Sequence, residues 1–337
     1  MLLVGDIGGT KTSLAVYSRP DRGDYPIGEA TLKSAAFSDP GALVQVFLNQ
    51  SGLRVDSAVF GIAGPVVHDA VRTTNLPWTI RAQDLRETLG LSNLWLLNDL
   101  QAVANSIPTL GSGDLEILQE GEFVKHSAIA VIAPGTGLGE AYLTDGADGY
   151  RAHASEGGHA DFAPLNALQI DLLNFLLEEY DHVSYERLCS GMGLPNIYRF
   201  LKKAKGFKEP DWLANQLKES SDPTPVIVRG AAQTEKPSAI CVETVRLFCE
   251  ILGAECSNVA LKFLATGGIY LAGGMLLKML DVFDKAVFLE AFRAKGRFAD
   301  LMSSIPVSII VNPNAALIGA SRFAFQQLEM QKRSASN

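Results

Sequence analysis

Near the start of the chain, two apolar runs flank a glycine-rich turn. This pattern predicts a β-hairpin whose tip carries Asp6, Gly8, Gly9, Thr10 and Lys11. Glycines let backbone N–H groups approach an anion closely, while threonine and lysine add side-chain donors. The tip is therefore a candidate polyphosphate site, and a turn with no function beyond its geometry is the alternative. Asp6 is an acceptor, so it would contribute only through a metal ion or by orienting the loop.

Two other phosphate-binding motifs are excluded by the spacing of these residues. A P-loop requires glycine immediately before its lysine, whereas Thr10 precedes Lys11 here and the next segment is predicted to be a strand. A dinucleotide fingerprint requires G-x-G-x-x-G at the start of a helix, and Gly5-Asp6-Ile7-Gly8 has a different spacing.

A second hairpin of the same kind is predicted further along the chain. Apolar segments at 128–133 and 141–143 flank a tip that contains Gly135, Thr136 and Gly137. Both tips keep a Gly-Thr pair between apolar runs, which favours an internal duplication over two coincidental turns. Two such tips could grip one polyphosphate from both sides.

Asn98 and Asp99 follow the buried strand predicted at 94–97. Ligands of open α/β sheets bind outside the carboxyl ends of the strands. An aspartate there can act as a general base toward a hydroxyl group. The alternative is that Asp99 caps the helix that begins at Leu100.

The loop 155–162 places Glu156, His159 and Asp161 around two glycines. We interpret it as a binding loop for a hydroxyl-rich ligand. A metal site made by His153, His159 and Asp161 is a weaker alternative, because no helix gives these residues metal-ligand spacing. A purely structural loop is the third interpretation.

Two further segments complete the set of candidate residues. Glu186 lies early in a helix predicted at 184–190, where an acidic residue is favourable for the helix alone. Gly273 and Gly274 follow an apolar strand and would let a base or a phosphate approach the backbone, or would simply make a tight turn.

Composition limits the class of protein. A net charge of −8 without a basic cluster argues against a nucleic-acid partner, and we find no apolar stretch long enough to span a membrane. The chain shows no signal peptide, and its four cysteines have no CxxC pairing, so we expect free thiols in the cytoplasm. Strands alternating with helices, among them helices at 39–50 and 313–325, predict an α/β fold.

Taken together, these segments resemble the bacterial glucokinase family, within the sugar kinase, heat-shock-70 and actin superfamily. The matching stretches follow the family order along nearly the whole chain: Gly5-Asp6-Ile7-Gly8-Gly9-Thr10, Thr74-Asn75 with Trp78, Asn98-Asp99, Gly135-Thr136-Gly137-Leu138-Gly139, the loop from Ser155 to Pro164, Glu186-Arg187 with Ser190-Gly191, Ala272-Gly273-Gly274 and Asn312-Pro313. The cysteine-rich zinc motif of the repressor-and-kinase sugar kinase group is absent from the sequence, which favours the branch of the enterobacterial and cyanobacterial enzymes.

The resemblance implies phosphorylation of D-glucose at its 6-hydroxyl by ATP and Mg²⁺. Asp99 is similar to the catalytic base of the family. The residues that resemble the sugar-binding set are Asn75, Asn98, Asp99, Glu156, His159 and Glu186. The residues that resemble the nucleotide-binding set are Gly8, Gly9, Thr10, Lys11, Gly135, Thr136, Gly137, Gly273 and Gly274. Asp6 resembles the residue that helps to hold Mg²⁺ through water, and Lys11 stands where some members have asparagine.

The implied architecture is two ribonuclease-H-like α/β domains with a cleft between them. The small domain would comprise residues 1–111 and 313–330, and the large domain residues 112–312. The family also implies a homodimer. The alternatives are a kinase for another hexose, a sugar-responsive regulator without turnover, and an ATP-driven chaperone or actin-like assembly protein.

Overall fold

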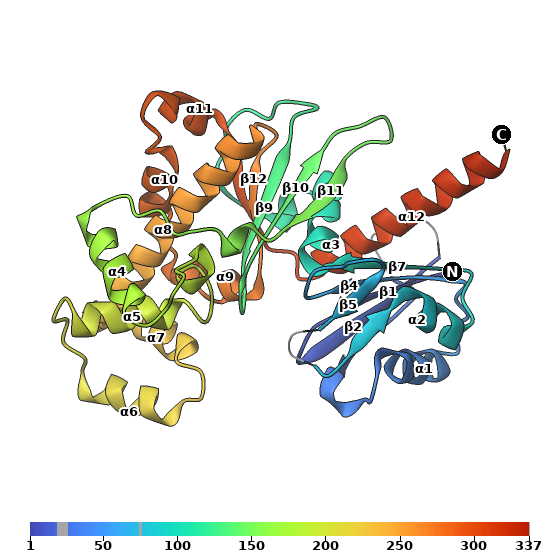
Figure 1. The fold of residues 1–337 in the computed structure, drawn as a ribbon, viewed down its shortest axis with the longest axis horizontal. Coiled ribbons are helices and arrows are strands. Elements are labelled where there is room, and N and C mark those ends of the chain that lie inside the picture. The colour runs from blue at the N-terminus through green and yellow to red at the C-terminus, as the bar shows by residue number, and fades with distance from the viewer. Residues whose placement is uncertain (19–25, 74–75, 337) are drawn as a thin grey trace. The chain divides into compact units, whose positions relative to one another are not determined.

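The computed structural model describes residues 1–18, 26–73 and 76–336. The chain divides into two compact units, and each combines a β-sheet with helices (Figure 1). The first unit comprises Met1–Asp114, Ala141–Ala154 and Asn312–Asn337. The second comprises Leu115–Glu140 and Ser155–Val311.

The sheet of the first unit has the strand order β3-β2-β1-β4-β7. Its strands are β1 (Leu2–Ile7), β2 (Lys11–Tyr17), β3 (Gly28–Lys33), β4 (Ser57–Ile62) and β7 (Asn93–Asn98). β1 pairs antiparallel with β2, which confirms the first predicted hairpin, and parallel with β4. β7 also runs parallel to β4, with Asn98 opposite Ile62, so the carboxyl ends of β1, β4 and β7 lie at one edge of the sheet. The short strands β5 (Ala70–Arg72) and β6 (Thr79–Arg81) form a separate pair.

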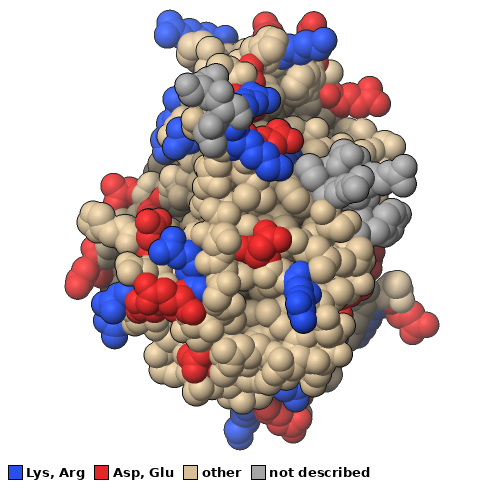
Figure 2. Space-filling model, turned by 90° about the vertical axis from the view of Figure 1, so that its right-hand side faces the viewer, with Lys and Arg blue, Asp and Glu red and all other residues tan. Residues whose placement is uncertain are grey.

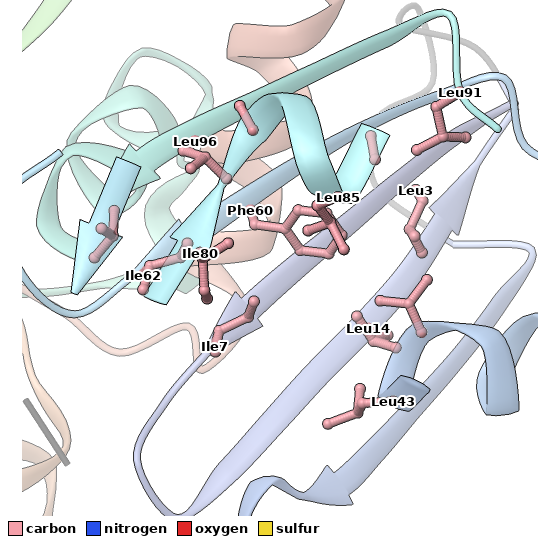
Figure 3. Close-up of a cluster of buried hydrophobic side chains, with 14 of the residues drawn as sticks. Leu3, Ile7, Leu14, Leu43, Phe60, Ile62, Ile80, Leu85, Leu91 and Leu96 are labelled. Carbon is pink, nitrogen blue, oxygen red and sulfur yellow. The ribbon is translucent and has the colours of Figure 1, made fainter. Parts of the chain in front are cut away.

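Helices cover both faces of this sheet. Side chains of a strand alternate between the two faces, so Leu3 and Ile7 join one cluster of buried residues while Leu2 and Val4 join another. The first cluster, with Phe60 at its centre, packs under α1 (Pro40–Ser51) and α2 (Ala82–Leu89) (Figure 3). The second packs under α3 (Asp99–Ser106) and α12 (Ala315–Ser336).

The start of α1 follows a local sequence signal, whereas the end of α12 differs from the prediction. Asp39 caps α1, where its Oδ1 accepts from the backbone N–H of Ala42 at 2.8 Å, as the sequence predicts. α12 continues well beyond the predicted end at Phe325. It packs so closely on α3 that a Cβ at Gly319 would lie 1.9 Å from the carbonyl oxygen of Ala102.

Residues 141–154 belong to the first unit, whereas the division predicted from the sequence places them in the large domain. The segment packs on the two helices of the second cluster. Gln101 of α3 donates through Nε2 to the carbonyl oxygen of Ala152 at 3.0 Å, and Gln326 of α12 donates to that of Asp148 at 3.4 Å. These contacts join parts of the chain that are distant in sequence, so no local pattern reveals them.

The six-stranded sheet of the protein has the strand order β11-β10-β9-β12-β13-β8. Its strands are β8 (Leu115–Gln119), β9 (Ile129–Pro134), β10 (Leu138–Thr144), β11 (Arg151–Ser155), β12 (Ile269–Leu271) and β13 (Val307–Ile310). β12 runs parallel to both β9 and β13, and β8 runs antiparallel to β13. Counted along the chain from β9, the five strands β9 to β13 lie across the sheet in the order third, second, first, fourth, fifth. The five strands of the other sheet have the same order, and the predicted duplication requires such a repeat.

Helices form most of the rest of the second unit. They are α4 (Ala167–Leu177), α5 (Leu194–Lys203), α6 (Asp211–Glu219), α7 (Thr224–Ala232), α8 (Ala239–Phe263), α9 (Gly274–Lys278), α10 (Lys285–Arg293) and α11 (Ala299–Ser304). α8 is buried along most of its length and packs on α10, where a Cβ at Gly253 would lie 2.2 Å from the carbonyl oxygen of Phe288. The helix predicted at 184–190 is only a 3-10 turn over Tyr185–Arg187.

The surface carries charges of both signs, and the cysteines lie in the interior. On the face shown in Figure 2, acidic and basic side chains of the described residues are interspersed. The four cysteines are buried and form no disulfide. Within the described ranges, no helix combines the length and the apolar character needed to cross a bilayer.

Candidate functional site

Two carboxylates lie near the carboxyl ends of the strands in the first unit. Asp6 is the penultimate residue of β1, and Asp99 is the first residue of α3, directly after β7. Burial and the negative charge of Asp99 raise the pKa of Asp6 to about 6, while Lys11 acts in the opposite direction. The backbone N–H of Leu100 donates to Asp99 Oδ1 at 2.8 Å. This pair can hold a proton or attract a cation at the sheet edge.

Asn98, rather than Asp99, is the N-cap of α3. Its Oδ1 accepts from the backbone N–H groups of Leu100 and Gln101 at 3.0 and 3.2 Å, and its Nδ2 donates to the carbonyl oxygen of Gly64 at 3.1 Å. The side-chain amide is thus engaged within the protein on both sides, and it fixes the start of the helix that carries Asp99. Asn75, the other predicted sugar-binding residue of this unit, lies outside the described residues.

The tip between β1 and β2 is tied to the start of the next segment of the chain. Gly8 donates through its N–H to the carbonyl oxygen of Lys11 at 3.0 Å, and the Ser34 hydroxyl donates to the carbonyl oxygen of Gly8 at 2.7 Å. Thr10 and Lys11 are exposed, and Gly8 and Gly9 are partly exposed. The predicted polyphosphate tip therefore has a fixed backbone and accessible donors.

In the second unit, three of the predicted residues come together. His159 lies with its Nε2 3.9 Å from Glu156 Oε2 and its Nδ1 3.8 Å from Glu186 Oε1. His159 and Glu156 are more than half exposed, whereas the Glu186 side chain is only 20% exposed. Two carboxylates that flank an imidazole present several acceptors and a donor, which suits the vicinal hydroxyl groups of a sugar.

Close packing explains the two glycines between Glu156 and His159. A Cβ at Gly157 would lie 2.0 Å from Glu140 Oε2, and a Cβ at Gly158 would lie 2.0 Å from the carbonyl oxygen of Leu138. Both glycines therefore let the loop lie directly on β10. The sequence suggested that they serve ligand binding, and the structure adds that they position the loop that carries the candidate residues.

The second glycine tip contacts one of these residues. The backbone N–H of Leu138, directly after Gly137, donates to Glu186 Oε2 at 2.9 Å. A Cβ at Gly137 would lie 2.3 Å from the same oxygen. The N–H of Gly191 donates to the carbonyl oxygen of Gly135 at 2.8 Å, which fixes the tip from the other side.

A cavity of about 600 Å³ lies beside this tip. Gly135, Thr136 and Gly274, all predicted as nucleotide-binding residues, line it. Gly273 does not line it. Instead, with a φ of +104° it brings the backbone close to β9, where a Cβ would lie 2.3 Å from the carbonyl oxygen of Pro134.

The sequence analysis gave no nucleotide-binding role to the other residues that line this cavity. They are Gly191, Met192, Asp222, Thr224, Pro225, Val228, Arg229, Met275 and Lys278. Several of them lie at or in α7, a helix that the sequence analysis did not predict. The proline pair Pro223 and Pro225 around Thr224 was the available signal, because proline is favoured at the first turn of a helix. The Thr224 hydroxyl donates to the carbonyl oxygen of Gly191 at 2.5 Å and so joins α7 to the segment near Glu186.

The metal interpretation of His153, His159 and Asp161 is not supported. His153 Nε2 lies 2.9 Å from the Thr144 hydroxyl, and Asp161 pairs with His182 at 2.9 Å. Across the part of the chain that the structure describes, no three His, Cys, Asp or Glu side chains are placed to hold a metal ion.

Comparisons with known proteins give matches over nearly the whole chain. The family model described as Glucokinase matches residues 3–327. A glucokinase of Nostoc punctiforme is 41% identical over 335 residues, which covers 95% of this chain and 98% of that protein. The crystal structure of a glucokinase from an Antarctic psychrotroph superposes with a TM-score of 0.82 at 29% identity, covering 96% of this chain and 98% of that chain.

A more distant solved structure shares the fold. The glucokinase of the ROK family from Streptomyces griseus, solved in complex with glucose and AMPPNP, superposes with a TM-score of 0.60 at 19% identity. The alignment covers 96% of this chain and 98% of that chain.

Proposed function

Because the chain belongs to the glucokinase family, we propose that it transfers the γ-phosphoryl group of ATP to the 6-hydroxyl of D-glucose. The products are glucose 6-phosphate and ADP. The observation that carries this proposal is the joining of Glu156, His159 and Glu186 to a glycine tip through the hydrogen bond from Leu138 to Glu186. A hydroxyl-binding set and a phosphate loop in direct contact are what a sugar kinase needs.

We assign the role of general base to Asp99. The new bond forms between the sugar 6-oxygen and the γ-phosphorus, and the bond from that phosphorus to the β,γ-bridging oxygen breaks. Asp99 accepts the proton of the attacking hydroxyl group. A positioned base contributes about 10²–10⁴-fold to such a step. The N-cap made by Asn98 supports this role, because it fixes the first turn of α3 and with it the carboxylate.

Glu156, His159 and Glu186 are proposed to bind the sugar hydroxyl groups. Their oxygens and imidazole nitrogens offer both acceptors and a donor, and a site built for hydroxyl groups rejects analogues that lack them. Asn98 is proposed to touch the sugar only secondarily, since both ends of its amide already have partners.

The two glycine tips are proposed to bind ATP. Gly8, Gly9, Thr10 and Lys11 form one, and Gly135, Thr136 and Gly137 form the other. The cavity of about 600 Å³ beside the second tip has the size of a ligand pocket and would take the adenosine, with Gly274 in its lining and Gly273 shaping the adjacent turn.

Asp6 is proposed to help hold Mg²⁺ through water. The fit follows from the donor: a single partly exposed carboxylate suits Mg²⁺, which keeps several waters and binds one or two carboxylates plus substrate phosphates. The nearby charge of Asp99 raises the pKa of Asp6, so a cation would relieve a repulsion that already exists. When bound, Mg²⁺ neutralises charge on the phosphate groups.

The remaining parts of the proposal concern architecture and setting. We propose that both units are ribonuclease-H-like domains, which the repeated strand order supports. We also propose that the protein is cytoplasmic, since four buried, unbridged cysteines suit a reducing compartment. The family resemblance leads us to propose a homodimer. Sedimentation of the purified protein tests the dimer.

A coupled assay with a panel of sugars tests the proposed activity. Glucose, mannose, fructose and glucosamine are supplied with ATP and Mg²⁺, and ADP release is followed together with glucose 6-phosphate. We expect strong preference for glucose with equal amounts of the two products. Turnover of another hexose alone would reassign the substrate, and absence of turnover while glucose binds would reject the kinase.

A further inference from the structure

Two buried acidic side chains of the second unit influence each other's charge and have no role in the proposed reaction. Glu140 lies in β10 and is 5% exposed, while Glu255 lies in the middle of α8 and is 0% exposed. Among the described residues, no donor reaches Oε1 of either side chain. Buried carboxylates are costly unless they are paired, hydrogen-bonded or protonated, so this pair requires an explanation.

The surroundings supply donors to only part of the pair. Asn258 Nδ2 donates to Glu255 Oε2 at 2.8 Å and to the Tyr185 hydroxyl at 2.9 Å. Lys295 Nζ donates to Asn258 Oδ1 at 2.6 Å. Lys262 Nζ lies 4.0 Å from Glu255 Oε1, beyond hydrogen-bonding distance, and its side chain is largely exposed. Tyr185 and Lys295 are the other titratable groups that interact with Glu255. The two glutamates in turn raise the pKa values of the fully buried thiols of Cys189 and Cys256.

The pair lies directly beneath the segments that carry the sugar-binding set. Glu140 Oε2 fills the position that a Cβ of Gly157 would need, so the carboxyl group is in contact with the loop from Glu156 to His159. Tyr185 directly precedes Glu186, and its hydroxyl accepts from the N–H of Ala163 at 3.4 Å as well as from Asn258. Any displacement of the pair is therefore passed to both segments.

Electrostatics favours one proton on the pair. Burial first, and then the charge of Glu255, raise the pKa of Glu140 to about 8, and Lys262 opposes this shift. Burial also raises the pKa of Glu255, while Asn258 and Lys262 oppose the shift there. A hydrogen bond between the two carboxyl groups raises the pKa of Glu140 and lowers that of Glu255, and such a bond exists only while one of the groups is protonated.

We propose that Glu140 and Glu255 share one proton and act as positioning residues that hold the Glu156–His159 loop in its sugar-binding position. The inference rests on the proposed function, because that loop is assigned to the sugar there. While the proton is present, the two groups hydrogen-bond and the loop keeps its place. Once it is lost, two adjacent charges repel and the support of the loop is disturbed.

The direction of the pH dependence follows from this state. Since the protonated pair is the competent form, affinity for glucose is highest below pH 8 and falls as the pH rises through about 8. For loss of a single proton, the KM for glucose should be about tenfold higher at pH 9 than at pH 7. The KM for ATP should change much less, because the cavity beside the second glycine tip is lined by other residues.

The test compares wild type with Glu140→Gln and Glu255→Gln. An amide can donate the hydrogen bond that the shared proton provides, and it does not titrate. Each variant should keep the wild-type KM for glucose at pH 7 within about threefold and should lose most of the rise at pH 9. Lys295 is still present in both variants. If the KM for glucose rises at pH 9 in the variants as it does in wild type, a group other than the glutamate pair causes the rise, and the proposal is overturned. Two variants guard against one failing to fold.

Glu122→Gln is the matched control, since Glu122 is an exposed carboxyl group of the same unit and should leave the wild-type rise intact. Glucose binding by calorimetry at pH 7 and pH 9 separates this inference from the proposed function, because it needs no phosphoryl transfer. Absence of glucose binding by wild type would reject the function. Binding that is independent of pH in wild type would reject the shared proton and leave the function standing.

Discussion

Glu186 links two parts of the candidate site through its two carboxylate oxygens. Its Oε2 accepts a hydrogen bond from the backbone N–H of Leu138 at 2.9 Å, directly after the second glycine tip, while its Oε1 lies 3.8 Å from His159 Nδ1. A side chain proposed to bind the sugar thus also fixes the backbone beside a tip proposed to bind phosphate. This arrangement makes Glu186 different from Glu156, which is more exposed and lies beside His159 alone among the predicted residues.

Replacing Glu186 should therefore affect both substrates. In Glu186→Ala the N–H of Leu138 loses a charged acceptor, and hydrogen bonds to charged groups contribute about 1.5–3 kcal/mol. We expect the KM values for glucose and for ATP each to rise about tenfold or more in steady-state kinetics. Glu156→Ala is the comparison, and there only the KM for glucose should rise. An unchanged KM for ATP in Glu186→Ala would show that the hydrogen bond does not hold the phosphate loop.

The raised pKa of Asp6 predicts an acidic limb in the activity profile. Burial and the charge of Asp99 place this pKa at about 6, and the ionised form is the one that attracts a cation. Activity should therefore be present above pH 6 and fall as the pH decreases through that value. The measurement is kcat/KM for ATP at saturating Mg²⁺, which reports the free enzyme. Asp6→Asn should have lower activity and should lose this fall. If kcat/KM of the variant still fell with the same midpoint as in wild type, Asp6 would not be the group that titrates.

Close packing between α3 and α12 predicts a stability effect at Gly319. A Cβ there would lie 1.9 Å from the carbonyl oxygen of Ala102, and because that atom is backbone the helices must separate. Gly319→Ala should therefore lower the free energy of unfolding by about 1–3 kcal/mol, the usual cost of overpacking. Gly113→Ala, where a Cβ would meet open space, is the control for urea unfolding. Equal midpoints for the two variants would refute the close contact.

Local sequence patterns predicted the parts of the fold that depend on neighbouring residues. The alternation of apolar residues around the glycine tip predicted the hairpin of β1 and β2, and Asp39 with Pro40 predicted the start of α1. These features are set within one or two turns of the chain. The pattern at 184–190 was misleading, because its apolar residues are buried by tertiary contacts around a 3-10 turn rather than along a helix.

Other features of the candidate site could not be predicted in this way. The sequence offered Asp99 as a possible cap of α3, but the preceding Asn98 takes that place, since its side chain reaches two N–H groups of the first turn. The electrostatic interaction between Glu140 of β10 and Glu255 of α8 couples a strand to a helix that lies far along the chain. The resemblance supplied the candidate site residues, and the structure shows which contacts hold those that it describes.

The most direct test of the central claim is Asp99→Asn, measured for both kcat and glucose binding. The amide keeps the size of the side chain but cannot accept the proton of the 6-hydroxyl group. We predict that kcat falls by about 10²–10⁴-fold while the Kd for glucose, measured by calorimetry, changes by less than about tenfold. A variant that keeps near-wild-type kcat would show that Asp99 is not the base of the reaction.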